Sequence, residues 1–244
     1  MLSLSGGTFV VSPGTSTPRE SCRTRRGGFI REVRVKAIFL STLLVFCLVC
    51  SASAAPAWVF LVDGELAALV QGPEKLTDRY NSIGFGGGAG LGAILTKQVM
   101  FVVTGNYTYI SIDEEGYRKV DELPDDASVE GGDLSIIYLS AGARYNLLKD
   151  PPKWTKPYVI AGAGWYRIEA KDVTVESTIL GQRTGLGGYE DVFGLNAGVG
   201  TDIFVSPTVN AFVEIQYQVG FTSNSNTATV PVRLGVAFLL GEDG

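Results

Sequence analysis

The sequence of 244 residues contains no histidine. Histidine is the usual general base near neutral pH and the commonest metal ligand, so its absence excludes Ser-His-acid hydrolysis, Cys-His proteolysis and histidine-ligated zinc. Charged residues are also scarce, at 18% against about 25% in ordinary soluble domains. We therefore expect a protein that is not an enzyme and that needs no cofactor.

Cysteine is limited to three residues, and all of them lie in the first 50 positions. This part of the chain has the organisation of a secretory signal peptide. Residues 37–50 are almost wholly apolar, follow basic residues and precede the cleavage motif Ala52-Ser53-Ala54. We expect a disordered or mis-assigned extension at residues 1–32, a signal peptide at 33–54 and a single folded domain at 55–244.

A membrane anchor is the alternative interpretation of the apolar run, because apolar character resumes at Trp58. A helix that crosses the bilayer needs about 20 apolar residues. The run has only fourteen, and Ser51, Ser53 and Pro56 interrupt the sequence that follows it. The signal peptide is therefore the favoured interpretation.

Removal of residues 1–54 changes the composition of the mature chain. The removed segment holds all three cysteines, seven basic residues and two acidic residues, so the remaining net charge is −10. This acidity argues against a nucleic-acid partner. The 31 glycines, with ten tyrosines and twelve phenylalanines, indicate β structure with closely approaching backbones.

Apolar and polar residues alternate with a period of two from Trp58 onward. In residues 210–221, for example, Val213 and Ile215 share one face, and Glu214 and Gln216 share the other. Alternation in segments of about ten residues is typical of a membrane-spanning strand. Eight such runs are present, near residues 58–70, 82–95, 99–112, 134–147, 157–169, 191–204, 209–221 and 229–240.

The connections between these runs alternate in length. Those at 71–81, 113–133 and 170–190 are long and polar, and 222–228 is shorter but also polar. Those at 96–98 and 205–208 are tight, and 148–156 is intermediate. The layout predicts an all-β, eight-stranded antiparallel up-and-down transmembrane barrel. Its N-terminus and short turns would lie in the periplasm, and its long loops outside.

A soluble eight-stranded barrel of the lipocalin type is the alternative fold. Its polar face would meet water and would carry many lysines and glutamates. Here the polar face is mostly Gly, Ser, Asn, Thr and Gln. In residues 84–92, every second position, from Gly84 to Gly92, places a glycine on that face. The interior of an eight-stranded barrel is only wide enough to be filled by side chains. The pattern therefore favours the membrane barrel.

Charged side chains are also predicted on the inward face. The set is Asp63, Glu65, Arg144, Asp202, Glu214 and Arg233, together with Arg167 if its strand keeps register. A hairpin centred near residue 224 would bring Glu214 and Arg233 to similar heights. Because an unpaired buried charge is costly, we expect a paired network that fills the barrel. A polar path for small solutes is the alternative.

Three further patterns bear on function. The acidic loop 113–133 could attract divalent cations, but it lacks the spacing of a calcium loop, so no metal site is expected. Gly88-x-Gly90-x-x-Ala93 matches a loose dinucleotide fingerprint, which requires a following helix rather than the turn and strand predicted here. Aromatic girdles at the membrane interfaces are indicated by Tyr107, Tyr109, Tyr145, Trp154, Tyr158, Trp165, Tyr166 and Tyr217.

The sequence resembles the outer-membrane β-barrel domain of small OmpA/OmpX-type proteins over residues 58–240. The matching segments are GPEKLTDRYNSIGFGGGAGLG at 72–92, KPYVIAGAGWY at 156–166, FGLNAGVGTDIF at 193–204, FVEIQYQVGFT at 212–222 and VPVRLGVAFLL at 230–240. One departure concerns the last strand. Such barrels often end on an aromatic residue read by the assembly machinery, whereas here Phe238 is followed by two leucines and Gly-Glu-Asp-Gly.

The resemblance implies a place in the outer membrane of a Gram-negative-type envelope. Barrels of this size act as structural or adhesive surface proteins, as narrow conduits, or as lipid A-modifying enzymes that depend on histidine. We therefore expect a non-enzymatic structural and surface-interaction role, with a narrow channel or transporter for small or apolar solutes as the alternative. The implied partners are outer-membrane lipid, lipopolysaccharide and the export and barrel-assembly machinery, and the implied state is a monomer.

Overall fold

The structure is a computed structural model that describes residues 57–72, 76–124, 126–149, 154–179, 181–222 and 226–240. The predicted N-terminal extension, the signal peptide and its cleavage residues Ala52 and Ala54 lie outside these ranges. Within them, neither helix combines the length and the apolar character that a membrane-crossing helix requires.

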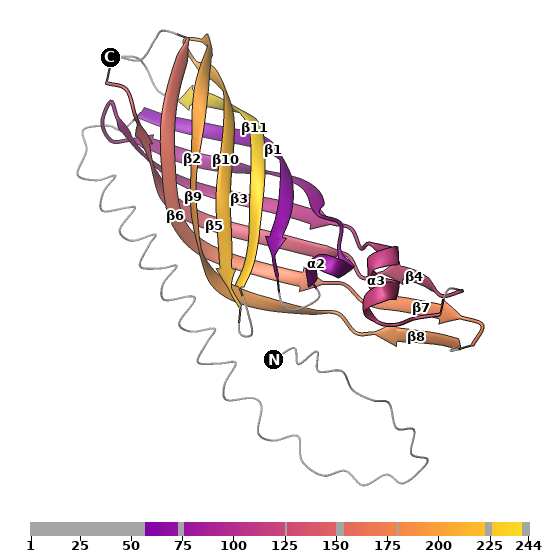
Figure 1. Ribbon diagram of the computed structural model, residues 1–244. Coiled ribbons are helices and arrows are strands. Elements are labelled where there is room, and N and C mark those ends of the chain that lie inside the picture. Colours follow the sequence, from indigo (N-terminus) through magenta and orange to yellow (C-terminus); the bar gives the residue numbers. More distant parts are fainter. Residues whose placement is uncertain are drawn as a thin grey trace, which may run out of the picture.

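Eight strands close into an antiparallel barrel (Figure 1). They are β1 (Ala57–Gln71), β2 (Ile83–Ile94), β3 (Val99–Ile110), β5 (Leu134–Asn146), β6 (Thr155–Ala170), β9 (Gly188–Ser206), β10 (Val209–Phe221) and β11 (Asn226–Leu240). Strands that are consecutive around the wall pair with each other, and β11 pairs back with β1. Each strand corresponds to one of the eight predicted runs, so the predicted eight-stranded antiparallel barrel is confirmed.

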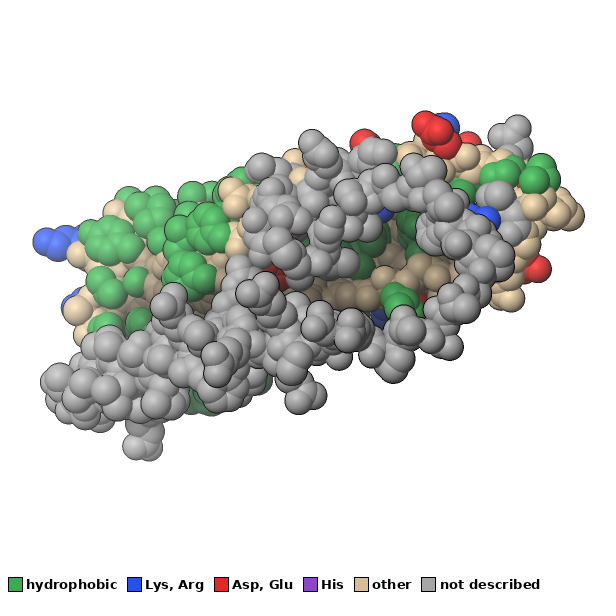
Figure 2. Space-filling model, turned by 90° about the horizontal axis from the view of Figure 1, so that it is seen from below, with side chains coloured by type: hydrophobic (Ala, Val, Ile, Leu, Met, Phe, Trp, Pro, Cys, Tyr) green, Lys and Arg blue, Asp and Glu red, His purple; other side chains and the backbone are tan. Residues whose placement is uncertain are grey.

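The apolar side of each strand faces outward. On β10, Glu214 and Gln216 are buried, whereas Val213 and Ile215 are 38% and 44% exposed. On β1, Leu66 is 61% exposed, whereas its neighbour Glu65 is buried. Hydrophobic side chains consequently cover much of the visible wall in Figure 2. An apolar exterior around a polar interior is the arrangement of a membrane-spanning barrel, and it is the reverse of a soluble one.

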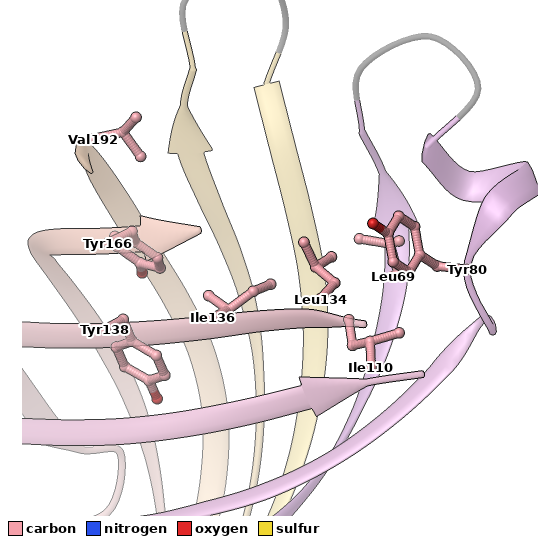
Figure 3. Close-up of a cluster of buried hydrophobic side chains, with 8 residues drawn as sticks. All are labelled: Leu69, Tyr80, Ile110, Leu134, Ile136, Tyr138, Tyr166 and Val192. Carbon is pink, nitrogen blue, oxygen red and sulfur yellow. The ribbon is translucent and has the colours of Figure 1, made fainter. Parts of the chain in front are cut away.

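The interior of the barrel is filled with side chains. A cluster of buried apolar residues fills the end that carries the long connections (Figure 3); its members are Leu69, Tyr80, Ile110, Leu134, Ile136, Tyr138, Tyr166 and Val192. A second cluster fills the end of the short turns, with Val59, Leu61, Val102, Ile160, Phe212 and Ala237. On β1, Asp63 and Glu65 lie between Leu61 of the second cluster and Leu69 of the first, whereas Arg144 lies against Phe212 of the second cluster.

Glycine on the inward faces makes room for this filling. A Cβ atom on Gly200 would lie 2.5 Å from the ring of Tyr158, and one on Gly88 would collide with the side chain of Asn106. A Cβ on Gly235 would collide with the ring of Phe212. The high glycine content therefore follows from how closely large lumen side chains approach the neighbouring backbone.

The long connections contain regular structure. They form α2 (Leu76–Arg79), α3 (Glu114–Val120) and a separate three-stranded sheet of β4 (Ser128–Gly131), β7 (Val173–Ser177) and β8 (Gly181–Gly185), in the order β4-β7-β8. We call these five elements the lobe; they lie together beyond one end of the barrel in Figure 1. The connections at 113–133 and 170–190, predicted only as long and polar, therefore contain regular structure that the sequence pattern did not indicate.

Local sequence accounts for α3 at least. The side chain of Asp113 accepts a hydrogen bond from the backbone N–H of Glu115 and so caps the helix. Acidic residues occupy the first turn, and Arg118 and Lys119 occupy the last turn. Both placements are favourable for the helix dipole. Three of the nine acidic residues in 113–133, Asp113, Glu114 and Glu115, thus stabilise the start of a helix.

Candidate functional site

Arg233 is the most central charged residue of the lumen, and its side chain is only 2% exposed. The register places it directly opposite Glu65 of β1 and directly opposite Glu214 of β10. Its Nε donates to Glu65 Oε2 at 3.0 Å, and its Nη1 donates to Glu214 Oε1 at 3.2 Å. The guanidinium also lies 5.2 Å from the ring centroid of Tyr138. One cation thus joins the first, tenth and eleventh strands of the fold.

Arg144 forms the second half of the network. Its Nη2 donates to Glu214 Oε2 at 3.2 Å, and its Nη1 donates to Asp202 Oδ1 at 3.3 Å. The guanidinium stacks 4.0 Å from the ring centroid of Tyr158, whose hydroxyl donates to the same oxygen of Glu214 at 3.0 Å. Glu214 therefore bridges the two arginines, and charge-assisted bonds of this kind are the stronger ones.

The remaining carboxylates are held by β3. Asn106 Nδ2 donates to Asp63 Oδ1 at 2.9 Å and to Glu65 Oε2 at 3.4 Å. The hydroxyl of Thr108 donates to the other oxygen of Glu65. Each carboxylate is therefore hydrogen-bonded from a strand other than its own, and the network ties the wall together across the lumen.

The structure brings together six of the seven charged residues predicted for the lumen: Asp63, Glu65, Arg144, Asp202, Glu214 and Arg233. Arg167 is the exception, and its placement in the lumen was wrong. Its side chain is 37% exposed and makes a two-pronged ion pair with Asp191, with Nε 2.8 Å from Oδ1. It lies on the outward face with Trp165 and Tyr189, whose ring centroids are 5.3 and 4.8 Å from the guanidinium.

Two of the aromatic residues predicted for interface girdles are also elsewhere. Tyr158 and Tyr166 are buried inside the barrel, where Tyr166 stacks on Tyr138 with ring centroids 5.4 Å apart. By contrast Tyr107, Tyr145 and Tyr217 are 45–48% exposed on the outer wall. The roles of Tyr158, Asn106 and Thr108 in the network were not predicted; alternation places the last two inward, but only the register shows which carboxylate they meet.

Some buried polar atoms of the lumen have no protein partner within the described residues. They are Arg144 Nε, Arg233 Nη2, Asn106 Oδ1, Asn196 Oδ1 and the hydroxyls of Tyr138 and Tyr166. Buried polar groups in this situation are commonly satisfied by ordered water. Part of the lumen therefore has the chemistry to hold isolated waters.

The charged side chains of the lumen are bonded mainly to one another. The lumen carboxylates are engaged by arginine, amide or hydroxyl donors, and no histidine is present to act as a base. Across the described residues, no group of three or more His, Cys, Asp or Glu side chains is placed to hold a metal ion. What the arrangement does chemically is neutralise charge and cross-link strands in a desolvated interior.

The lobe carries its own polar contacts. Arg79 Nη2 pairs with Asp121 Oδ1 at 2.6 Å, and its guanidinium lies 5.2 Å from the ring centroid of Tyr117, so this residue links α2 to α3. Burial raises the pKa of Tyr117, and burial raises the pKa of Tyr80 beside it to about 12. Both phenols therefore stay neutral at physiological pH.

An exposed carboxylate fastens the tip of the β7–β8 hairpin. Asp126 accepts hydrogen bonds from the Thr178 backbone N–H at 2.9 Å, from the Thr178 hydroxyl and from Ser177 Oγ. These donors, the Thr178 hydroxyl first, lower the pKa of Asp126. A polar cavity of about 510 Å³ opens near α3, with Asp78, Asn81 and Asp113 among its lining residues.

Comparison with known proteins places the fold. No family model matches this sequence, and no curated protein matches it. Among solved structures, Neisserial surface protein A matches 75% of this chain and 97% of its own, with 17% identity and a TM-score of 0.50. The chain has the fold of the small eight-stranded outer-membrane barrels.

Other solved barrels give lower scores. The alignment with Ail, the attachment invasion locus protein of Yersinia pestis, covers 76% of this chain and 99% of the Ail chain at 10% identity, with a TM-score of 0.46. OprG of Pseudomonas aeruginosa covers 77% and 98% at 8% identity, with a TM-score of 0.43. At these identities the similarity concerns the backbone and not the residues of the lumen or the lobe.

Proposed function

We propose that this protein resides in the outer membrane as a filled, non-enzymatic barrel with a structural and surface-interaction role. The barrel would hold the lobe at the cell surface. The observation that carries the proposal is the filling of the lumen, in which a cross-linked network of buried charges is packed with two apolar clusters. An interior built in this way favours rigidity and opposes passage of ions, since a charge is costly in an apolar layer.

The proposed orientation follows from the chain. β1 starts at the end of the short turns, directly after the predicted signal peptide, so this end would face the periplasm. The lobe would then face outside, as the long connections of such barrels do. The two ends also differ in charge, since residues 113–133 contain nine acidic and two basic residues, whereas 147–156 contain three lysines and one aspartate. Most of the acidic side chains visible in Figure 2 lie at the lobe end.

The proposed partners are those of an outer-membrane protein. The apolar wall would contact lipid, and the acidic lobe would meet lipopolysaccharide, whose phosphates are bridged by divalent cations that prefer carboxylate oxygens. The export and barrel-assembly machinery would bring the chain there, and we propose that it functions as a monomer. The ordered sheet of the lobe supports a surface role, because it presents three strands beyond the membrane region.

A narrow channel or transporter for small or apolar solutes is the second candidate. The buried polar atoms without a protein partner favour it, because hydrated positions next to Arg144 and Arg233 could be connected if the network rearranged. The two candidates differ in one measurable property. A filled barrel gives no stable conductance, and a channel gives discrete steps.

Three experiments test the proposal. Fractionation of cells, with gel mobility compared before and after boiling, should place the protein in the outer membrane as a heat-modifiable barrel. Protease added to whole cells should cut the lobe and spare residues 147–156. Purified protein in planar bilayers should show no unitary conductance. Recovery from the soluble periplasm would overturn the location, and reproducible conductance steps would favour the channel.

A further inference from the structure

A groove opens in the outer wall of the barrel close to the short turns. Its volume is about 330 Å³, at the lower end of the range of about 300–1,000 Å³ for small-molecule sites. It crosses β6, β9 and β10 and is bounded by the chain that leaves β5; its lining residues are Leu147, Pro157, Tyr158, Val199, Gly200, Thr201, Val213 and Ile215.

The groove has a simple origin in the register. Thr201 of β9 stands directly opposite Pro157 of β6 on one side and Val213 of β10 on the other. The compact side chains of Thr201 and Pro157 therefore lie side by side on the outward face. Larger apolar residues border them, with Leu147 52% and Val199 53% exposed. The result is an apolar depression in the outer wall, suited in chemistry to a hydrocarbon chain.

Basic and aromatic residues lie at the periplasmic end of this groove. Lys149 is exposed and follows Leu147 by two residues. Lys97 is exposed in the neighbouring turn, where its carbonyl accepts a hydrogen bond from Asn146, the residue before Leu147. Trp154 is 69% exposed, and its backbone carbonyl accepts a hydrogen bond from the N–H of Phe204, near the end of β9. Lysine and tryptophan in this position are suited to the headgroup region of a bilayer.

We propose that the groove binds one anionic glycerophospholipid of the periplasmic leaflet. One acyl chain would lie over Thr201 and Pro157, and the phosphate would meet Lys149 and Lys97. Charge complementarity selects this occupant: the groove itself is apolar, and cations stand beside its periplasmic end. The inference rests on the proposed function in requiring that the barrel is inserted in a membrane with its short turns toward the periplasm.

The test uses the mature chain inserted in nanodiscs that contain equal amounts of phosphatidylglycerol and phosphatidylcholine with identical acyl chains. Native mass spectrometry of the released barrel counts the lipids that remain bound. We expect one retained phosphatidylglycerol, favoured over phosphatidylcholine by about fivefold or more, since a lysine near an anionic surface contributes about 1 kcal/mol. Equal retention of the two lipids, or retention of neither, would overturn the inference.

Variants separate the two parts of the site. Thr201→Phe should fill the groove and remove the retained lipid, whereas Ala89→Phe, at an exposed position of the outward face of β2, should not. Lys149→Gln should retain a lipid but lose about fivefold of the preference for phosphatidylglycerol. Loss of lipid in both phenylalanine variants, or in neither, contradicts the site.

Two further outcomes are distinguishable. A dimer mass in the wild type that disappears in Thr201→Phe would mean that a second copy, rather than a lipid, covers the groove, and would overturn the inference. A boiling-dependent gel shift confirms that each variant is folded. A chain that inserts normally but retains no lipid refutes the lipid site alone. A chain that never inserts refutes the proposed function and the lipid site together.

Discussion

Glu214 of β10 and Arg233 of β11 stand directly opposite each other in the register, with Arg233 Nη1 3.2 Å from Glu214 Oε1 inside the barrel. The second oxygen of the same carboxylate receives Arg144. A single glutamate therefore forms ion pairs with two buried guanidinium groups. Loss of Arg233 removes the arginine partner of Glu65 in a desolvated interior, and this is the basis of the first prediction.

We expect Arg233→Ala to destabilise the folded barrel by about 3–5 kcal/mol, the usual effect of removing one partner of a buried ion pair. The midpoint of urea unfolding in detergent or lipid, followed by tryptophan fluorescence, measures the change. Arg167→Ala is the control, because its pair with Asp191 is more than a third exposed and should contribute less than about 1 kcal/mol. Equal midpoints for the two variants would contradict the structural role of the network.

The second prediction concerns the space that glycine leaves in the lumen. In Gly200→Val, the new side chain would meet the ring of Tyr158 and displace it from Glu214. Overpacking of this kind costs typically about 1–3 kcal/mol, which should lower the temperature at which the gel-shifted folded form disappears. Gly64→Val is the matched control, since the nearest atom to its Cβ is 3.9 Å away. An unchanged temperature for Gly200→Val would show that this part of the lumen is loosely packed.

The third prediction concerns the lobe. Arg79→Ala removes both the ion pair with Asp121 and the contact with Tyr117, so we expect faster amide exchange in α2 and α3 by a factor that corresponds to about 1 kcal/mol. Lys119→Ala serves as the control, because its pair with Glu115 spans 4.0 Å between fully solvated side chains. Exchange in the barrel strands should be the same in both variants. Equal exchange of α3 in the two variants would mean that Arg79 does not fasten the helices.

The fourth prediction is a pH dependence at the hairpin tip. The pKa of Asp126 is lowered in the folded state, so the contribution of this carboxylate is complete above the unfolded-state value of about 3.9 and is lost as pH falls through the lower folded-state value. Amide exchange at Thr178, corrected for its intrinsic pH dependence, should therefore show constant protection from neutral pH down to about 5 and lose it below about 4.

The variant Asp126→Asn tests the same contact at neutral pH. An amide oxygen can still accept a hydrogen bond but lacks the charge, so protection of Thr178 should fall and its acid dependence should disappear. Glu130→Gln removes a charge from β4 of the same sheet and should leave Thr178 unchanged. A pH profile in Asp126→Asn like that of the wild type would assign the acid dependence to another group.

Much of the barrel could be predicted because the wall has a strong polarity contrast. On β10, Val213 and Ile215 alternate with Glu214 and Gln216. A single assignment of the inward face therefore buries both polar residues and exposes both apolar ones. The contrast is missing on β6, where Tyr158 and Val159 are both apolar in character, although the first is buried and the second is exposed. Arg167 was misplaced for this reason.

The lobe was missed because its elements are short and their stability comes from contacts outside them. β7 and β8 are five residues each, and all of β8 is exposed. Neither strand has a periodic pattern long enough to identify it. The contacts of Asp126 with Thr178 and of Arg79 with Asp121 join residues 52 and 42 positions apart, and no local signal specifies such pairs.

Glu65 and Arg233 come from the first and the last strand of the fold and are 168 residues apart in the chain. Their ion pair can form only when β11 meets β1, the pairing that joins the two ends of the sheet. Before this pairing forms, Arg233 can meet Glu214 of the adjacent strand but not the carboxylate of Glu65. Closure of the seam therefore completes the charge pairing of Arg233, and closure in another register leaves Glu65 without its arginine. The Glu65–Arg233 pair thus selects the correct seam.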